Sequence, residues 1–122
     1  MKIINPRLHS IIDYLVVLFL WISPSAFQLP ESTTYFTYVL GGVHLLLTIG
    51  TKYPGGIIKV IPLAVHGWVE FIVSILLFGV GVYFGNTEGE LSRNFYFAFA
   101  GAVFATWFLT RYRENKIMTP KS

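Results

Sequence analysis

The chain has 122 residues, of which 54% are hydrophobic and 12% are charged, and its formal net charge is +3. A soluble domain carries about 25% charged residues, so this composition predicts a single integral membrane domain over residues 1–122. The chain contains no cysteine, which excludes a disulfide framework, thiolate chemistry and a cysteine-ligated metal site.

The sequence predicts four helices separated by short polar or Pro/Gly-rich connections. Each apolar stretch is long enough to cross a hydrocarbon core about 30 Å thick at a rise of about 1.5 Å per residue. The four stretches cover approximately residues 8–27, 33–51, 62–84 and 91–110. Because the connections are short, we expect an all-α integral membrane four-helix bundle with up-down-up-down topology.

The basic residues are distributed unequally between the two ends of the predicted spans. Arg93 is expected at one end. All other Lys and Arg residues are expected at the opposite end: Lys2, Arg7, Lys52, Lys59, Arg111, Arg113, Lys116 and Lys121. The positive-inside rule then places both termini in the cytoplasm. We interpret the basic charge as a topology signal, and expect the lipid bilayer, not nucleic acid, as the partner.

The two halves of the sequence form an internal repeat, with one unit over about residues 2–53 and the other over about 59–112. The clearest matches lie 57 or 59 positions apart: His9 with His66, Asp13 with Glu70, and Thr51-Lys52-Tyr53 with Thr110-Arg111-Tyr112. Each unit contains two spans, so both units should have the same orientation. The sequence therefore predicts two tandem hairpins related by an axis along the membrane normal, a parallel repeat.

Five ionisable side chains within the predicted spans form the candidate ligand-binding site: His9, Asp13, His44, His66 and Glu70. His9 and Asp13 are four residues apart, as are His66 and Glu70, so each pair shares one helix face. A charged side chain within a span costs about 2.5–3.5 kcal/mol, which favours burial in the bundle interior. We expect a polar cluster in the cytoplasmic half, serving either as a ligand site or only as interhelical hydrogen-bond partners.

Other patterns predict packing and membrane anchoring. Gly81-x-x-x-Gly85 has the spacing that lets helices approach closely. Aromatic residues near the span ends predict two interfacial belts, one with Tyr53, Trp68, Trp107 and Tyr112 and the other with Trp21, Tyr35, Tyr83 and Tyr96. The sequence has no GxSxG, P-loop or HExxH motif, so hydrolase and nucleotide-binding functions have little support.

The run His9-x3-Asp13-Tyr14, followed by Ser23-Pro24 and echoed by His66-x3-Glu70-Phe71, resembles the small bacterial membrane proteins described as SPW-repeat proteins. Ser25 stands where the tryptophan of Ser-Pro-Trp would be. The resemblance implies two tandem hairpins, a location in the bacterial inner membrane, and a family whose activity is unassigned.

The leading hypothesis is a non-enzymatic membrane protein that forms homo-oligomers and binds a small ligand, a cation or protons at its His/carboxylate cluster. One alternative is a b-type haem or quinone electron-transfer protein, in which His9 and His66 are axial ligands of the haem. Another is an oligomeric proton or ion transporter or channel subunit, in which Asp13, His44 and Glu70 relay ions. No cofactor or metal is specified by the sequence itself.

Overall fold

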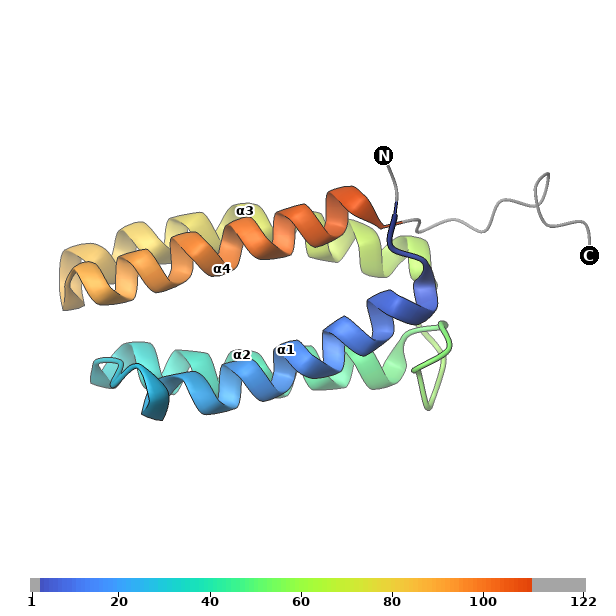
Figure 1. Cartoon of the computed structure of the whole chain (residues 1–122), viewed down its shortest axis with the longest axis horizontal. Helices are drawn as coiled ribbons and strands as arrows, with labels where there is room; N and C mark the ends of the chain where they lie inside the picture. Colours follow the sequence, from blue (N-terminus) through green and yellow to red (C-terminus); the bar gives the residue numbers. More distant parts are fainter. Residues whose placement is uncertain (1–2, 111–122) are drawn as a thin grey trace, which may run out of the picture.

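The computed structural model describes residues 3–110, and this part of the chain is all-helical, with no strand beyond two isolated bridges. The helices are α1 (Pro6–Ala26), α2 (Glu31–Gly50), α3 (Leu63–Glu88) and α4 (Glu90–Leu109) (Figure 1). The four-helix prediction is confirmed. The main difference from the predicted boundaries is that α3 continues to Glu88, past the polar residues expected to end it.

Local sequence explains where the helices begin and end. The Asn5 side chain caps α1 by accepting a hydrogen bond from the Leu8 backbone N–H at 2.8 Å, and Pro6 suits the first helical position. Pro30 and Pro62 precede α2 and α3. Between α3 and α4, Gly89 adopts φ of 108°, a backbone conformation that favours glycine.

The helices form two hairpins that pack face to face. In Figure 1, α1 and α2 lie in one layer, and α3 and α4 lie in the other. Both hairpin turns are at one end, and the long connection between α2 and α3 is at the opposite end, beside the start of α1. The buried hydrophobic core combines residues of α1, α3 and α4: Leu20, Leu77, Phe84, Tyr96, Phe99 and Ala100.

Small residues on α3 allow close contact with α4. A Cβ atom built on Gly81 would lie 2.6 Å from the Phe97 ring, and one on Gly85 would lie 2.8 Å from Arg93 Cβ. Larger residues at either position would therefore push the two helices apart. This agrees with the packing role expected for Gly81-x-x-x-Gly85.

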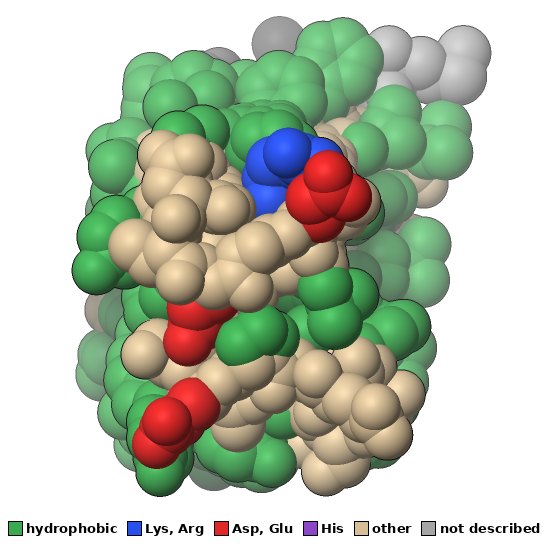
Figure 2. Space-filling model, turned by 90° about the vertical axis from the view of Figure 1, so that its left-hand side faces the viewer, with side chains coloured by type: hydrophobic (Ala, Val, Ile, Leu, Met, Phe, Trp, Pro, Cys, Tyr) green, Lys and Arg blue, Asp and Glu red, His purple; other side chains and the backbone are tan. Residues whose placement is uncertain are grey.

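The outward faces of all four helices expose large hydrophobic side chains, among them Leu15, Leu46, Leu76 and Phe108. Viewed onto the end with the two turns, charged and other polar groups occupy the middle of the face, and hydrophobic side chains border it (Figure 2). Among the described residues, α1 and α3 are the two helices that are long and apolar enough, by length and composition, to cross a bilayer. Two of the four expected spans therefore have this support.

The predicted aromatic belts are only partly consistent with the structure. Tyr35, Trp68 and Tyr83 are exposed, as expected for interfacial residues. Tyr53 and Tyr96 are instead buried, and assigning them to the belts was wrong. Each phenol has a polar partner inside the protein, Asp13 Oδ2 for Tyr53 and Thr37 Oγ1 for Tyr96, and this makes burial favourable. The predicted belt residue Tyr112 lies outside the described residues.

Candidate functional site

All five candidate residues meet at the end of the bundle that carries the connection between α2 and α3. His9 and Asp13 come from α1, His44 from α2, and His66 and Glu70 from α3. His9 and His66 are fully buried, Asp13 and Glu70 are nearly so, and the His44 side chain is 18% exposed. The cluster therefore lies between the two hairpins, with His44 at its edge.

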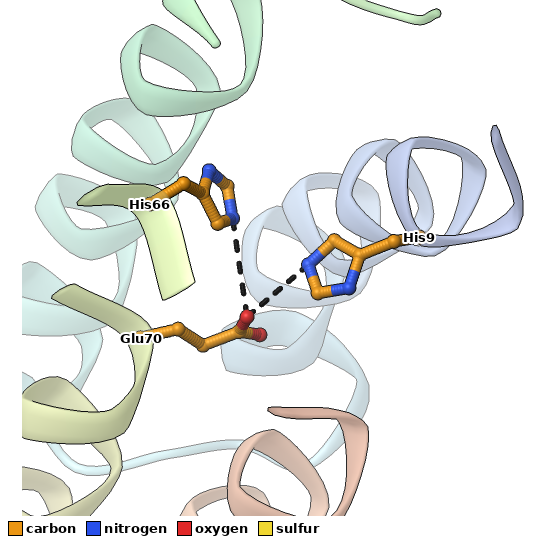
Figure 3. Close-up of side chains that lie close together, drawn as sticks. All are labelled: His9, His66 and Glu70. Atoms are coloured by element: carbon orange, nitrogen blue, oxygen red, sulfur yellow. Dashed lines mark ion pairs between the residues drawn. The ribbon is translucent and has the colours of Figure 1, made fainter. Parts of the chain in front are cut away.

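Both acids lie within ion-pair distance of histidines. Asp13 Oδ2 is 3.3 Å from His9 Nε2 and 3.3 Å from His66 Nε2, and Asp13 Oδ1 is 3.5 Å from His44 Nε2. Glu70 Oε1 is 3.1 Å from His9 Nε2 but 3.9 Å from His66 Nε2. Figure 3 shows both imidazoles turned towards the Glu70 carboxylate.

Glu70 thus pairs more closely with the opposite hairpin than with its own helix. His66 and Glu70 share one helix face, as the sequence indicated, but His9 Nε2 lies closer to Glu70 Oε1 than His66 Nε2 does. Glutamate is one methylene longer than aspartate, so the Glu70 carboxylate can reach across to α1. The acid of each hairpin is consequently shared between His9 and His66.

Two threonines, which the sequence analysis did not assign to the site, orient the buried imidazoles. Thr51 is the C-cap of α2, and its hydroxyl donates to Leu47 O at 2.6 Å and lies 2.8 Å from His66 Nδ1. Thr110 is the C-cap of α4, and its hydroxyl donates to Thr106 O and lies 2.8 Å from His9 Nδ1.

These hydrogen bonds determine which imidazole nitrogen faces the acids. A hydroxyl has one hydrogen to donate, and each threonine hydroxyl gives it to a backbone carbonyl. Each hydroxyl must therefore accept a hydrogen from the histidine, so Nδ1 carries the N–H in both rings. The Nε2 atoms of His9 and His66 then face the carboxylates, where each can hold a lone pair or a proton.

Tyr53 is a further site residue that the sequence analysis placed elsewhere. Its hydroxyl donates to Asp13 Oδ2 at 2.6 Å, and its side chain is buried beside both imidazoles. Burial and the neighbouring Asp13 carboxylate raise the pKa of the Tyr53 phenol above its usual range. The phenol therefore stays protonated and acts as a hydrogen-bond donor to Asp13.

The cluster is flanked by two small cavities. One, of about 90 Å³, lies between the hairpins and is lined by His44, His66 and Glu70 together with apolar side chains. The other, of about 40 Å³, is lined by Asp13, His44 and Glu70 and by apolar residues of α1 and α4. Both are large enough to admit water or a small ion, so the polar groups are accessible to a small occupant.

The arrangement favours positive charge beside the acids. Two buried carboxylates are costly unless they are protonated or paired with a cation. Protons on the histidines, or a bound cation among them, would supply that charge. His9, His66 and Glu70 each offer a donor atom, and these three atoms lie within 4.8 Å of one another, so they are the residues best placed to hold a metal ion.

Comparison of the chain with protein-family models, with curated proteins and with solved structures finds no match. The geometry and charge of this site are therefore the basis for inferring a function.

Proposed function

We propose that the protein is a small non-enzymatic integral membrane protein whose His/carboxylate cluster binds a small cation. The observation that carries the proposal is the convergence of Asp13 and Glu70 with three histidines in a buried space that connects to small cavities. A bound cation would neutralise the two carboxylates without requiring water inside the bundle. The Thr51 and Thr110 hydroxyls donate their hydrogen to backbone carbonyls and accept from the imidazoles, so neither histidine is placed as a base towards them, and binding is favoured over covalent catalysis.

The exposed apolar faces and the end-to-end charge difference support a membrane location with all four helices crossing. Arg7, Lys52 and Lys59 lie near the site end, whereas Arg93 lies near the turns with Glu31, Glu88 and Glu90. This distribution supports a cytoplasmic site end in an inner membrane. The other basic residues of the prediction, Lys2, Arg111, Arg113, Lys116 and Lys121, lie outside the described part of the chain.

A tandem parallel repeat is part of the proposal, and paired contacts support it. His9 contacts Thr110, and its counterpart His66 contacts Thr51, the counterpart of Thr110. Likewise, Ile4 N donates to Leu109 O at 2.9 Å, and Ile61 N donates to Gly50 O at 2.7 Å. Each hairpin thus completes the other's histidine site. The SPW-repeat resemblance is compatible with this arrangement and rests on the sequence motif alone.

The alternative functions differ in how well they fit the site. A haem between His9 and His66 would need a slot for a planar macrocycle, but both Nε2 atoms face the same Glu70 oxygen, and the ring centroids are 5.3 Å apart at 84°. The hairpins would have to separate to admit haem. An ion transporter or channel subunit fits better, because the cavities flank the acids, and that function would require a homo-oligomer.

The membrane part of the proposal is tested by fractionation. We expect the full chain to stay in the membrane fraction after an alkaline carbonate wash and to need detergent for extraction. Release by the wash would refute an integral membrane location.

The cation site is tested by thermal unfolding of the chelator-treated protein in detergent. Na⁺, K⁺, Mg²⁺, Ca²⁺ and Zn²⁺ salts are added in turn at matched ionic strength. Because a ligand that binds only the folded state stabilises it by about 2.7 kcal/mol at 100 times its Kd, at least one cation should raise Tm. The double variant D13N/E70Q should lose the increase, whereas E90Q, which changes an exposed acid at the other end, should keep it. No increase with any cation would contradict a cation site.

A further inference from the structure

We propose that His9, His66 and Glu70 bind one divalent transition-metal ion, with Zn²⁺ as the best fit. This inference rests on the proposed function and specifies the class of cation and its ligands. The three residues come from both hairpins, so the metal would join α1 to α3 at the centre of the site (Figure 3).

The distances between donor atoms are close to those of a metal site. Zinc ligands at about 2.0–2.2 Å from the ion are about 3.4 Å from one another in a tetrahedral arrangement. Glu70 Oε1 lies 3.1 Å from His9 Nε2 and 3.9 Å from His66 Nε2, and no two donor atoms of the three residues are more than 4.8 Å apart. Small side-chain movements would therefore bring all three into coordination distance.

The threonines provide an independent argument. A histidine that ligates a metal through one nitrogen ordinarily donates the N–H of the other to a fixed acceptor, which sets the tautomer and the ring direction. Thr110 is that acceptor for His9, and Thr51 is that acceptor for His66, because each hydroxyl donates its own hydrogen to a backbone carbonyl. Both Nε2 atoms are thus directed to the same place with the lone pair that a metal needs.

The charges also balance for a divalent ion. With both imidazoles neutral, Glu70 and Asp13 contribute two negative charges, and a divalent metal makes the group neutral. Asp13 Oδ2 lies 3.3 Å from each Nε2 while the Tyr53 hydroxyl holds it in place. Asp13 can therefore compensate the charge from beside the ion without leaving its hydrogen-bonded position.

The ligand types select among cations. Imidazole nitrogen suits zinc and other transition metals, whereas Ca²⁺ and Mg²⁺ prefer sites made of oxygen ligands. Two of the three proposed ligands are nitrogen. The absence of cysteine from the chain removes thiolates as competing ligands, so metal bound by the protein reports on its histidines and carboxylates.

The experiment titrates the chelator-treated, detergent-purified full chain with CoCl₂ as a spectroscopic probe. We expect visible d–d absorption that saturates at one equivalent and is displaced by one equivalent of Zn²⁺. If the imidazoles are doubly protonated in the metal-free protein, each must lose its Nε2 proton to bind metal, and the titration should then release protons into a weakly buffered solution. If the wild-type chain shows no saturable cobalt spectrum, the metal assignment is overturned.

Variants test the ligand set. E70Q retains the shape of the side chain and should lower cobalt affinity at least tenfold, and H66Q should do the same. E90Q makes the same Glu-to-Gln change outside the site and should leave the spectrum unchanged. Unaltered cobalt binding by a folded E70Q variant would refute the assignment. If H66Q fails to fold, the comparison of E70Q with E90Q decides whether the ligand set is correct.

The Tm and cobalt measurements together distinguish failure of the transition-metal assignment from failure of the cation site. If Na⁺, K⁺, Mg²⁺ or Ca²⁺ raises Tm through Asp13 and Glu70 while cobalt and zinc do not bind, the cation site stands and the transition-metal assignment is wrong. If no cation binds, both are wrong.

Discussion

The helix-ending threonines illustrate how single residues define the chemistry of the cluster. A threonine that donates to the carbonyl four residues earlier is a common local hydrogen bond, and at Thr51 and Thr110 it also makes the hydroxyl an obligatory acceptor. The histidine of the other hairpin supplies the donor. The same atom thus caps a helix end and fixes an imidazole tautomer.

Tyr53→Phe tests the hydrogen bond between Tyr53, in the connection between α2 and α3, and Asp13 of α1. The lost hydrogen bond leaves Asp13 Oδ2 without its hydroxyl donor, and we expect unfolding free energy in detergent to fall by about 1–2 kcal/mol. Tyr35→Phe removes an exposed hydroxyl and serves as the control. In a double-mutant cycle, the effect of Tyr53→Phe should shrink in a D13N background. Equal losses in both backgrounds would show that Tyr53 acts through something other than Asp13.

The five ionisable members of the cluster could be predicted because a charged group in an apolar helix has few acceptable places other than an interior with partners. The same reasoning failed for Tyr53, because an aromatic residue beside a helix end fits an interfacial position equally well. Only tertiary packing shows that its hydroxyl reaches Asp13. The match of Thr51-Lys52-Tyr53 with Thr110-Arg111-Tyr112 was the available signal, since it marked polar residues that both halves share.

At the scale of the elements, an acid of α3 caps the start of α2 at the turn end. Helix α2 has no side-chain cap of its own. The Glu88 carboxylate at the end of α3 accepts hydrogen bonds from Ser32 N at 2.9 Å and from Thr33 N at 2.7 Å. A carboxylate is favourable at a helix N-terminus, where unpaired N–H groups and the helix dipole both attract it. The extension of α3 to Glu88 therefore provides the cap for α2.

Glu88→Ala should destabilise the protein by about 1 kcal/mol, the usual cost of losing a helix cap. The matched control is Glu90→Ala, which removes a nearby exposed acid from the first turn of α4. Denaturant unfolding of the two variants in detergent measures the difference. If the two alanine variants lose equal stability, Glu88 contributes only general charge and not a cap.

Helix positions were predictable to within a few residues, because proline and glycine mark the breaks between the apolar stretches. The end of α3 was not, since Gly85-Asn86-Thr87 suggested a polar turn. Gly85 instead makes room for Arg93 of α4, and the partner that stabilises the last turn of α3 is in α2. Contacts of this kind between distant segments cannot be read from local sequence.

At the scale of the whole molecule, different groups join the two hairpins at the two ends of the bundle. The turn end joins the hairpins through Glu88, Thr33 and Ser92, with Thr33 Oγ1 lying 2.6 Å from Ser92 Oγ. The opposite end joins them through the His/carboxylate cluster and the backbone contacts of Ile4 and Ile61. Between these ends the outer surface is apolar, the form expected of a bundle whose middle lies in lipid.

The proposed topology predicts which end chemical reagents reach in intact cells. Because the chain has no cysteine, a single introduced cysteine can be labelled without removing others. With a cytoplasmic site end, Glu90→Cys at the turns should react with a membrane-impermeant maleimide added outside the inner membrane. Lys52→Cys, in the exposed connection between α2 and α3, should react only after the membrane is permeabilised.

The two labelling results together decide the placement of the site. The reverse pattern would invert the topology and put the His/carboxylate cluster towards the outer face, where a cation would enter from the periplasm instead of the cytoplasm. Reaction of both cysteines in intact cells would mean that the helices do not separate the two ends by a bilayer. The positive-inside argument would then have no basis, because Arg7, Lys52 and Lys59 would face the same solvent as Glu31, Glu88 and Glu90.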